Sequence, residues 1–200
     1  MLLPQQIAAQ FPIGQIEQID EIRSGLMHST YSVQAAEGRF TLQRLHKKLA
    51  TAEIVGDYEA VTNHLYRAHV PAPRLIRTRL DQAVFIDDED RWWRLATWVN
   101  GYTPSQVENV YQVEQGARAL GRFHRTMAQF DHHFESQHPL HDTKAHLKGL
   151  RDAVSTPEYR DHQVLVSAEI EEILVALPDL MLPDSLPQRV VHGDPKISNV

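Results

Sequence analysis

The sequence of 200 residues predicts a two-lobed α+β fold, with a small antiparallel sheet lobe followed by a mainly helical lobe. Up to Asn100, short apolar runs alternate with turn residues, a pattern typical of strands joined by tight connections. After Gly101, apolar residues recur at helical spacings instead. We therefore expect an N-terminal lobe over residues 1–100 and the first part of a helical lobe over residues 101–200.

The first lobe is predicted to contain both strands and helices. In chain order we expect a helix over 2–11, a strand beginning at Ile16, a hairpin over 31–42, a helix over 54–65, and strands over 74–76, 83–86 and 92–99. The longer helix follows from apolar residues that recur on one helical face: Ile54, Tyr58, Val61 and Leu65. The acidic run over 87–90 forms the last turn. We interpret it as a solvated turn rather than a metal site, because carboxylates in tight turns usually face water.

The second lobe begins with an apolar stripe of helical spacing. Its members are Val113, Ala117, Leu120, His124 and Met127. This position predicts that His124 is a hydrogen-bonded core residue rather than a ligand. A second helix is expected over 166–177, and the apolar pair Val190–Val191 predicts a short buried strand before the C-terminal segment.

The C-terminal segment carries a spaced set of chemically useful side chains. His192-Gly193-Asp194 is followed, after four residues, by Asn199. At average composition this pattern has a chance probability on the order of 10⁻³ in a chain of this length. The catalytic loop of protein kinases has the same spacing, with Arg in place of Gly. The alternative, an ordinary turn capped by Asn199, does not account for Lys196 and Asn199 together.

These residue types suit phosphoryl transfer, which depends on positioning and on neutralising charge. Asp194 would accept or orient the proton of an attacking hydroxyl. Lys196 would offset the charge that develops on the transferred phosphate. Asn199 would offer its amide oxygen to Mg²⁺, which prefers oxygen ligands. The motif therefore indicates a kinase that uses ATP and Mg²⁺.

Further segments extend the similarity to kinases over about residues 19–200. They are Gly25–Tyr31, Phe40–Leu45, Asp57–Val61, Val70–Ile76, Leu95–Gly101 and Leu120–His124. With these segments in this order and with the His-Gly-Asp loop, the chain resembles the aminoglycoside phosphotransferase-like family of small-molecule kinases. The resemblance implies a protein-kinase-like fold and transfer of the γ-phosphate of ATP to a hydroxyl of a small molecule.

The resemblance also implies where the nucleotide binds. Gly25 would lie in the turn that covers the phosphates. Glu59 would be the helix glutamate that reaches a cation on the adjacent strand. Thr97 and Val99 would present backbone groups of the hinge between lobes to adenine.

One departure from the family concerns the cation on the third strand. The position that usually holds the phosphate-binding lysine is Gln43. Arg44, or a lysine of the pair Lys47-Lys48, would have to substitute for it.

Two short strings indicate the acceptor. Leu42-Gln43-Arg44 and Pro139-Leu140-His141-Asp142-Thr143 look most like the N-acetylhexosamine 1-kinase branch, which phosphorylates amino sugars. Asp142 would contact the sugar, because a carboxylate can accept two hydroxyl hydrogens. The histidine-rich segment 131–146 also leaves a zinc site or a solvated loop open as interpretations.

A different class of function is a non-catalytic nucleotide- or sugar-binding module. In the family that the chain resembles, a second metal-binding Asp follows the Asn closely, whereas this sequence ends one residue after Asn199. The chain thus looks truncated just after the catalytic loop, with an incomplete C-terminal lobe. We expect the 200 residues alone to be inactive.

Composition argues against several other classes of protein. The net charge is −6, so the chain lacks the excess of basic residues that is typical of proteins that bind nucleic acid or anionic lipid. The chain has no cysteine, so disulfides and thiolate metal sites are excluded. Its N-terminus lacks a signal-peptide pattern, and no apolar run approaches the length of about 18 residues that spans a membrane. We expect a cytoplasmic protein that binds neither nucleic acid nor membrane.

Overall fold

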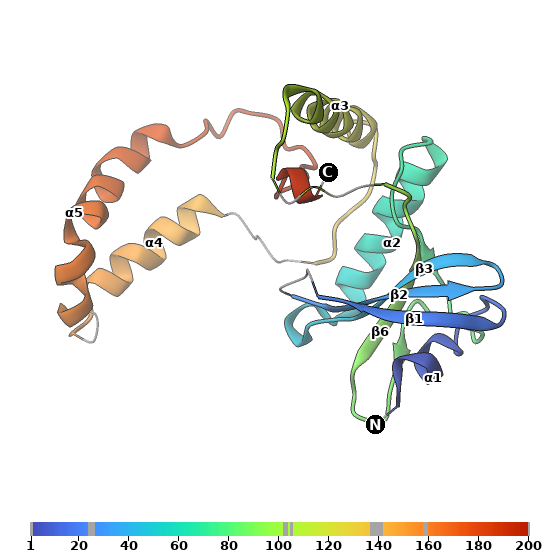
Figure 1. Cartoon of the computed structure of the whole chain (residues 1–200). Coiled ribbons are helices and arrows are strands. Elements are labelled where there is room, and N and C mark those ends of the chain that lie inside the picture. The colour runs from blue at the N-terminus through green and yellow to red at the C-terminus, as the bar shows by residue number, and fades with distance from the viewer. Residues whose placement is uncertain are drawn as a thin grey trace. The chain divides into compact units, whose positions relative to one another are not determined.

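The computed structural model describes residues 2–23, 27–101, 104, 106–136, 142–157 and 160–199 (Figure 1). Contacts within the chain define two compact units. The first is Met1–Gln137 with Val190–Val200, and the second is His138–Arg189. The C-terminal segment therefore belongs to the same unit as the sheet. The predicted lobe boundary at Asn100 follows a different criterion, the change from strands to helices, and stays a prediction.

A six-stranded antiparallel sheet dominates the first unit (Figure 1). Its strands are β1 (Ile16–Ile22), β2 (Ser29–Ala35), β3 (Gly38–Arg44), β4 (Leu75–Ile76), β5 (Phe85–Ile86) and β6 (Trp92–Thr97). The strand order is β1-β2-β3-β6-β4, and β5 pairs with β6. An antiparallel sheet combined with separate helices confirms the predicted α+β class.

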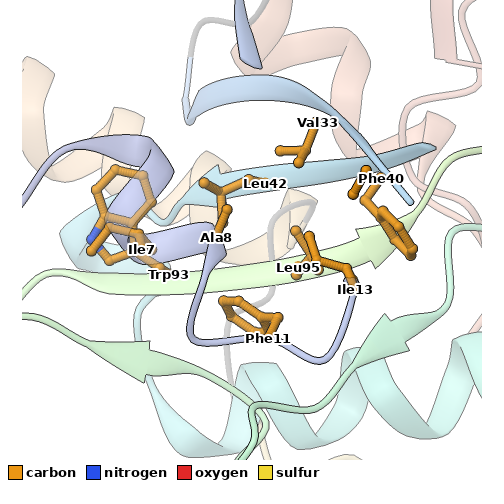
Figure 2. Close-up of a cluster of buried hydrophobic side chains, with 10 residues drawn as sticks. Ile7, Ala8, Phe11, Ile13, Val33, Phe40, Leu42, Trp93 and Leu95 are labelled. Atoms are coloured by element: carbon orange, nitrogen blue, oxygen red, sulfur yellow. The ribbon is translucent and has the colours of Figure 1, made fainter. Parts of the chain in front are cut away.

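One face of the sheet packs against α1 (Pro4–Ala8) and the loop that follows it. Figure 2 shows the side chains of this core pointing toward one another from α1, from the loop and from β2, β3 and β6. Phe11 and Leu42 are among its fully buried members. Helix α1 is shorter than the predicted helix over 2–11: it begins at Pro4 and ends at Ala8, and residues 9–10 form a turn. Pro12 in addition disfavours helical backbone at Phe11.

The opposite face of the sheet carries polar side chains and meets α2 (Ala52–Arg67). Successive residues of a strand point to opposite faces. Leu42 and Leu95 point into the core, so their neighbours Gln43 and Arg94 lie on this second face. Helix α2 includes the predicted helix over residues 54–65 and extends it at both ends.

Helix α3 (Val110–Met127) agrees with the predicted helix but not with its predicted burial. Within the apolar stripe only Met127 is buried, and His124 is exposed beside Phe123. The prediction of a core His124 is therefore wrong. Helical spacing identifies the residues that share a face, but it does not tell which part of that face a neighbouring element covers.

The predicted buried strand at Val190–Val191 is also wrong. The two residues have no regular secondary structure, and Val191 is 64% exposed. A strand needs a neighbour for its backbone N–H and C=O groups. None of the strands in the described part of the chain pairs with this segment.

The second unit contains α4 (Thr143–Val154) and α5 (Arg160–Ala176), which contact each other, followed by the short helix η3 (Leu177–Leu180). Helix α4 was not predicted. Helix α5 begins before the predicted start at Val166, where the backbone departs from helical geometry. No helix within the described residues is long and apolar enough to cross a membrane.

Candidate active site

The predicted catalytic side chains meet in one short loop. Asn199 Nδ2 donates hydrogen bonds to Asp194 Oδ2 at 2.6 Å and to the Asp194 backbone oxygen at 3.1 Å. Lys196 Nζ lies 3.3 Å from the same Oδ2. Gly193 permits this turn, since its φ of 83° lies in the left-handed region that favours glycine. A carboxylate, an ammonium and an amide therefore share one small surface.

Helix α3 supports the loop through packing. The ring of His192 meets the ring of Phe123 edge-on, with 5.8 Å between ring centres. Ile197 lies against Gly116, where an added Cβ would come within 3.2 Å of Ile197 Cδ1. These contacts give His192 a packing role and orient the backbone that carries Asp194.

The catalytic candidates are open to solvent. The side chains of Asp194 and Lys196 are 60% and 58% exposed. An exposed ion pair contributes only about 0–1 kcal/mol to stability, so Lys196 can leave Asp194 for a phosphate oxygen at little cost. The loop thus offers an acceptor for a hydroxyl proton, a mobile positive charge and, in Asn199, an amide oxygen.

The structure separates the two β3 residues that could bind phosphate. Gln43 lies on the polar face, where its Nε2 donates to Thr30 Oγ1 at 3.3 Å. Arg44 lies on the core face, where Nη2 donates to Ser29 Oγ at 2.7 Å and the guanidinium is 6.0 Å from the ring centre of Trp93. This orientation turns Arg44 away from the lysine position that Gln43 occupies.

Glu59 has a cationic partner, but not on β3. Its carboxylate accepts hydrogen bonds from Arg77 Nε at 2.9 Å and Arg77 Nη2 at 2.8 Å. Arg77 directly follows β4. Gly25, expected in the phosphate-covering turn, lies outside the described residues.

Within residues 97–99 of the predicted hinge, one backbone donor has no partner among the described residues. The N–H of Thr97 donates to the backbone oxygen of Arg74 at 2.8 Å, and the N–H of Trp98 donates to that of Arg39 at 3.1 Å. The N–H of Val99 has no partner among the described residues, and Val99 is 40% exposed. Val99 is therefore the hinge residue that can donate to an adenine, whereas Thr97 ties β6 to the segment before β4.

Asp142, the expected acceptor contact, caps helix α4. Its Oδ1 accepts the backbone N–H of Ala145 at 2.9 Å. His138 and His141 of the histidine-rich segment lie outside the described residues. Within the described ranges, no group of three or more His, Asp or Glu side chains is placed to hold a metal ion. A zinc site thus has no support from the part of this segment that the structure describes.

Asp57 of α2 is a buried carboxylate that the sequence analysis missed. It accepts hydrogen bonds from His132 Nε2 at 2.8 Å and from the backbone N–H groups of Glu135 at 3.2 Å and Ser136 at 2.9 Å. Burial raises the pKa of Asp57, but these hydrogen bonds outweigh it and lower the pKa to about 2. Asp57 thereby ties the segment after α3 to α2. The only signal in the sequence was an Asp beside the apolar face of a predicted helix.

The prediction that the acidic turn is solvated is wrong for its first residue, Asp87. Its side chain is fully buried, and Oδ2 accepts from Arg91 Nε at 2.8 Å and Trp93 Nε1 at 2.9 Å. Its Oδ1 accepts the backbone N–H groups of Glu89 and Arg91, both at 3.0 Å. Burial raises the pKa of Asp87, and these donors overcome that effect and lower it to about 2. The run does form a turn, but its first carboxylate holds the turn together.

Known proteins similar to the chain are phosphotransferases. The model of the phosphotransferase enzyme family matches residues 18–200. Among curated proteins no significant match is found. An amicoumacin kinase in complex with AMP-PNP and Ca²⁺ is 17% identical, with a TM-score of 0.62 over 88% of this chain and 53% of that chain. An aminoglycoside phosphotransferase from Alicyclobacillus acidocaldarius is 16% identical, with a TM-score of 0.51 over 86% of this chain and 54% of that chain.

A third similar structure is a spectinomycin phosphotransferase in complex with ADP and spectinomycin. It is 10% identical, with a TM-score of 0.50 over 86% of this chain and 55% of that chain. At these identities the likeness shows a shared fold. The chain spans about half the length of each of these solved proteins.

Proposed function

The chain belongs to the phosphotransferase enzyme family, and we propose that it transfers the γ-phosphate of ATP to a hydroxyl group of a small molecule. The observation that carries the proposal is the loop in which Asp194, Lys196 and Asn199 lie within hydrogen-bond or ion-pair distance. Positioned groups of this kind are what phosphoryl transfer requires of a protein. Because the chain spans about half the length of similar solved proteins, the proposal concerns the activity of the whole protein.

Each side chain of the loop has its own role in the proposed reaction. Asp194 accepts or orients the proton of the attacking hydroxyl, and its exposure leaves room for an acceptor. Lys196 moves from Asp194 to the transferred phosphate and offsets the charge that develops there. Asn199 holds Asp194 in place through its amide nitrogen.

The same amide group suits Mg²⁺. Because Asn199 Nδ2 donates to Asp194 and its Oδ1 has no partner among the described residues, that oxygen can take a cation. An amide oxygen is a hard ligand of the type that Mg²⁺ prefers, and Mg²⁺ takes few protein ligands because it keeps water and phosphate oxygens. When bound, the ion would neutralise charge on the phosphates of ATP.

The nucleotide is proposed to bind along the polar face of the sheet, with its adenine at the hinge. The available N–H of Val99 supports this position, and Thr97 holds the hinge strand. Gly25 is proposed to cover the phosphates. Glu59 acts indirectly in this proposal, by fixing Arg77 beside α2. The use of ATP points to a reaction in the cytoplasm.

The acceptor is proposed to be a sugar, in particular an N-acetylhexosamine. The support is the resemblance at Leu42–Arg44 and around Asp142, with Asp142 as the sugar contact. The similar solved proteins include an amicoumacin kinase and a spectinomycin phosphotransferase, so the fold accommodates small-molecule acceptors.

The test is phosphate transfer from γ-labelled ATP and Mg²⁺ by the complete gene product to N-acetylhexosamines and to aminoglycosides. Asp194→Asn should lower the rate by about 10²–10⁴-fold, the usual contribution of a general base. Asp179→Asn, an exposed aspartate of the second unit, is the matched control and should keep the wild-type rate. Undiminished transfer by the Asp194→Asn variant would refute the proposed mechanism.

A non-catalytic module that binds a nucleotide or a sugar is the second candidate. Gln43 at the position of the usual lysine favours it, because the strand then lacks its phosphate-binding cation. A nucleotide-binding module would bind AMP-PNP and a sugar-binding module would bind the sugar, but neither would transfer phosphate to any acceptor. Binding and transfer measured on one preparation therefore distinguish the two functions.

A further inference from the structure

We propose that Arg94 of β6 supplies the phosphate-binding cation that β3 lacks. The proposal rests on the proposed function, since it assigns a residue to that nucleotide site. Arg94 is the direct partner of Gln43 in the pairing of β3 with β6. Directly paired residues of an antiparallel sheet share a face. The guanidinium therefore lies one strand away from the predicted lysine position, on the same polar face.

Neutral groups hold Arg94 in place. Its Nε and Nη2 both donate to Gln43 Oε1, at 3.0 and 2.9 Å. On the other side, the guanidinium carbon lies 4.0 Å from the ring centre of Tyr58 on α2. Gln43 is itself bound to Thr30, and the Tyr58 hydroxyl donates to the backbone oxygen of Pro73 at 3.1 Å. Gln43 thus acts as a neutral support that orients the cation instead of being one.

The charge of Arg94 is not balanced within the described structure. No carboxylate among the described residues forms an ion pair with it, whereas Arg77 binds Glu59 and Arg91 binds Asp87. Burial lowers the pKa of Arg94, which reflects the cost of a desolvated charge. A charge taken out of water is expensive unless it is paired. An anionic ligand would remove this cost.

The surroundings of Arg94 are basic. Burial and, after it, the positive charge of Arg94 lower the pKa of His28, which lies within the predicted phosphate-covering segment Gly25–Tyr31. The backbone N–H of His46 donates to His28 Nδ1 at 3.1 Å, and the backbone N–H of Lys48 donates to His46 Nδ1 at 3.3 Å. Both rings therefore accept at Nδ1 and carry their proton on Nε2, where it can be donated to an anion.

These features fit a polyphosphate better than a structural ion pair. Guanidinium groups bind phosphate oxygens through several N–H donors at once, and Arg94 uses only two of its nitrogens for Gln43. Arg44, the other candidate on β3, already donates to Ser29 on the opposite face. The phosphate-binding cation on the polar face of the sheet is thus Arg94 of β6 rather than a residue of β3.

The test measures the affinity of the complete protein for AMP-PNP with Mg²⁺ and for adenosine, which carries no phosphate. Arg94→Gln should weaken AMP-PNP binding by at least about tenfold, the loss expected for hydrogen bonds to a charged group. It should change adenosine affinity by less than about twofold, which also shows that the fold persists. The double variant Gln43→Lys with Arg94→Gln returns the cation to β3 and should recover most of the AMP-PNP affinity. A merely structural Arg94 would not allow this rescue.

Three results would overturn the assignment while leaving the proposed function in place. One is unchanged AMP-PNP affinity in Arg94→Gln. Another is an equal loss of both affinities that the double variant does not restore. The third is a larger loss of AMP-PNP affinity in Arg44→Gln than in Arg94→Gln. If the wild-type protein binds no AMP-PNP at all, the nucleotide site itself is refuted, and the proposed function fails with it.

Discussion

Replacing Asp87 by asparagine should destabilise the first unit by about 2 kcal/mol at neutral pH. The substitution keeps the shape of the side chain but removes its charge and turns one oxygen into an amide nitrogen, which cannot accept a hydrogen bond. Both oxygens are engaged, Oδ2 by Arg91 Nε and Trp93 Nε1 and Oδ1 by two backbone N–H groups. The variant therefore leaves buried donors without an acceptor.

The pKa of Asp87 gives the size of the effect. Lowering it from 3.8 to about 2 corresponds to about 2 kcal/mol of stabilisation by the charged form. Because the pKa is depressed in the folded state, this stabilisation is fully present above the unfolded-state value of 3.8 and is lost as the pH falls through the folded-state value. With both pKa values taken into account, about 1 kcal/mol of this stabilisation is lost as the pH falls from about 5 to about 3.

Urea unfolding followed by tryptophan fluorescence measures this contribution, since all three tryptophans of the chain belong to the first unit. The difference between wild type and Asp87→Asn should shrink by about 1 kcal/mol from about pH 5 to about pH 3. Asp90→Asn is the matched control. Asp90 is exposed in the same turn, and its φ of 56° suits asparagine, so its effect should stay within about 0.5 kcal/mol. A difference for Asp87→Asn that does not change with pH would refute the reasoning.

The remaining predictions concern α2 and the core. Asp57→Asn should lower the free energy of unfolding by about 2 kcal/mol at neutral pH, because the hydrogen bonds to Asp57 outweigh its burial and lower its pKa to about 2. The variant should also speed hydrogen exchange at the backbone N–H of Glu135, which donates to Asp57. Unchanged exchange at Glu135 would contradict the role of Asp57 in holding the segment after α3 to α2. Leu42→Ala should lower the free energy of unfolding by about 2–5 kcal/mol in the same urea assay, because Leu42 is fully buried. A loss below about 1 kcal/mol would contradict the burial of Leu42 in the core. Glu59→Gln should change the free energy of unfolding by less than about 1 kcal/mol, because the side chain of its partner Arg77 is 43% exposed. A larger loss of stability would show that the ion pair is less accessible to water than its exposure indicates.

The sheet could be predicted from the sequence because its signals are local. Alternating apolar residues and turn residues identified β1, the hairpin of β2 and β3, and β6 within a few residues of their bounds. Helix α4 had local signals too, a capping Asp142 followed by Leu147, Leu150 and Val154 at helical spacing. It was missed because the neighbouring histidines led to an interpretation of the segment as a loop, either solvated or ligand-binding.

Burial in the second half of the chain could not be predicted in the same way. The exposure of His124 and Val191 depends on which distant segments cover them, and periodicity within one element carries no such information. The buried carboxylate of Asp87 has the same origin. Its donors from Arg91 and Trp93 become visible only once the turn and β6 are folded together.

The same distinction bears on the choice between the two candidate functions. Asp194, Lys196 and Asn199 were predictable because all three lie within one short loop, whereas the pairing of Gln43 with Arg94 joins residues 51 positions apart. Judged by position alone, Gln43 marks a missing lysine and favours a degenerate binding module. The register of β3 and β6 instead puts a desolvated guanidinium, without a carboxylate among the described residues, directly across from it. If Arg94 binds phosphate, Gln43 no longer counts against catalysis, and the choice depends on whether the Asp194 loop transfers the phosphate that the sheet binds.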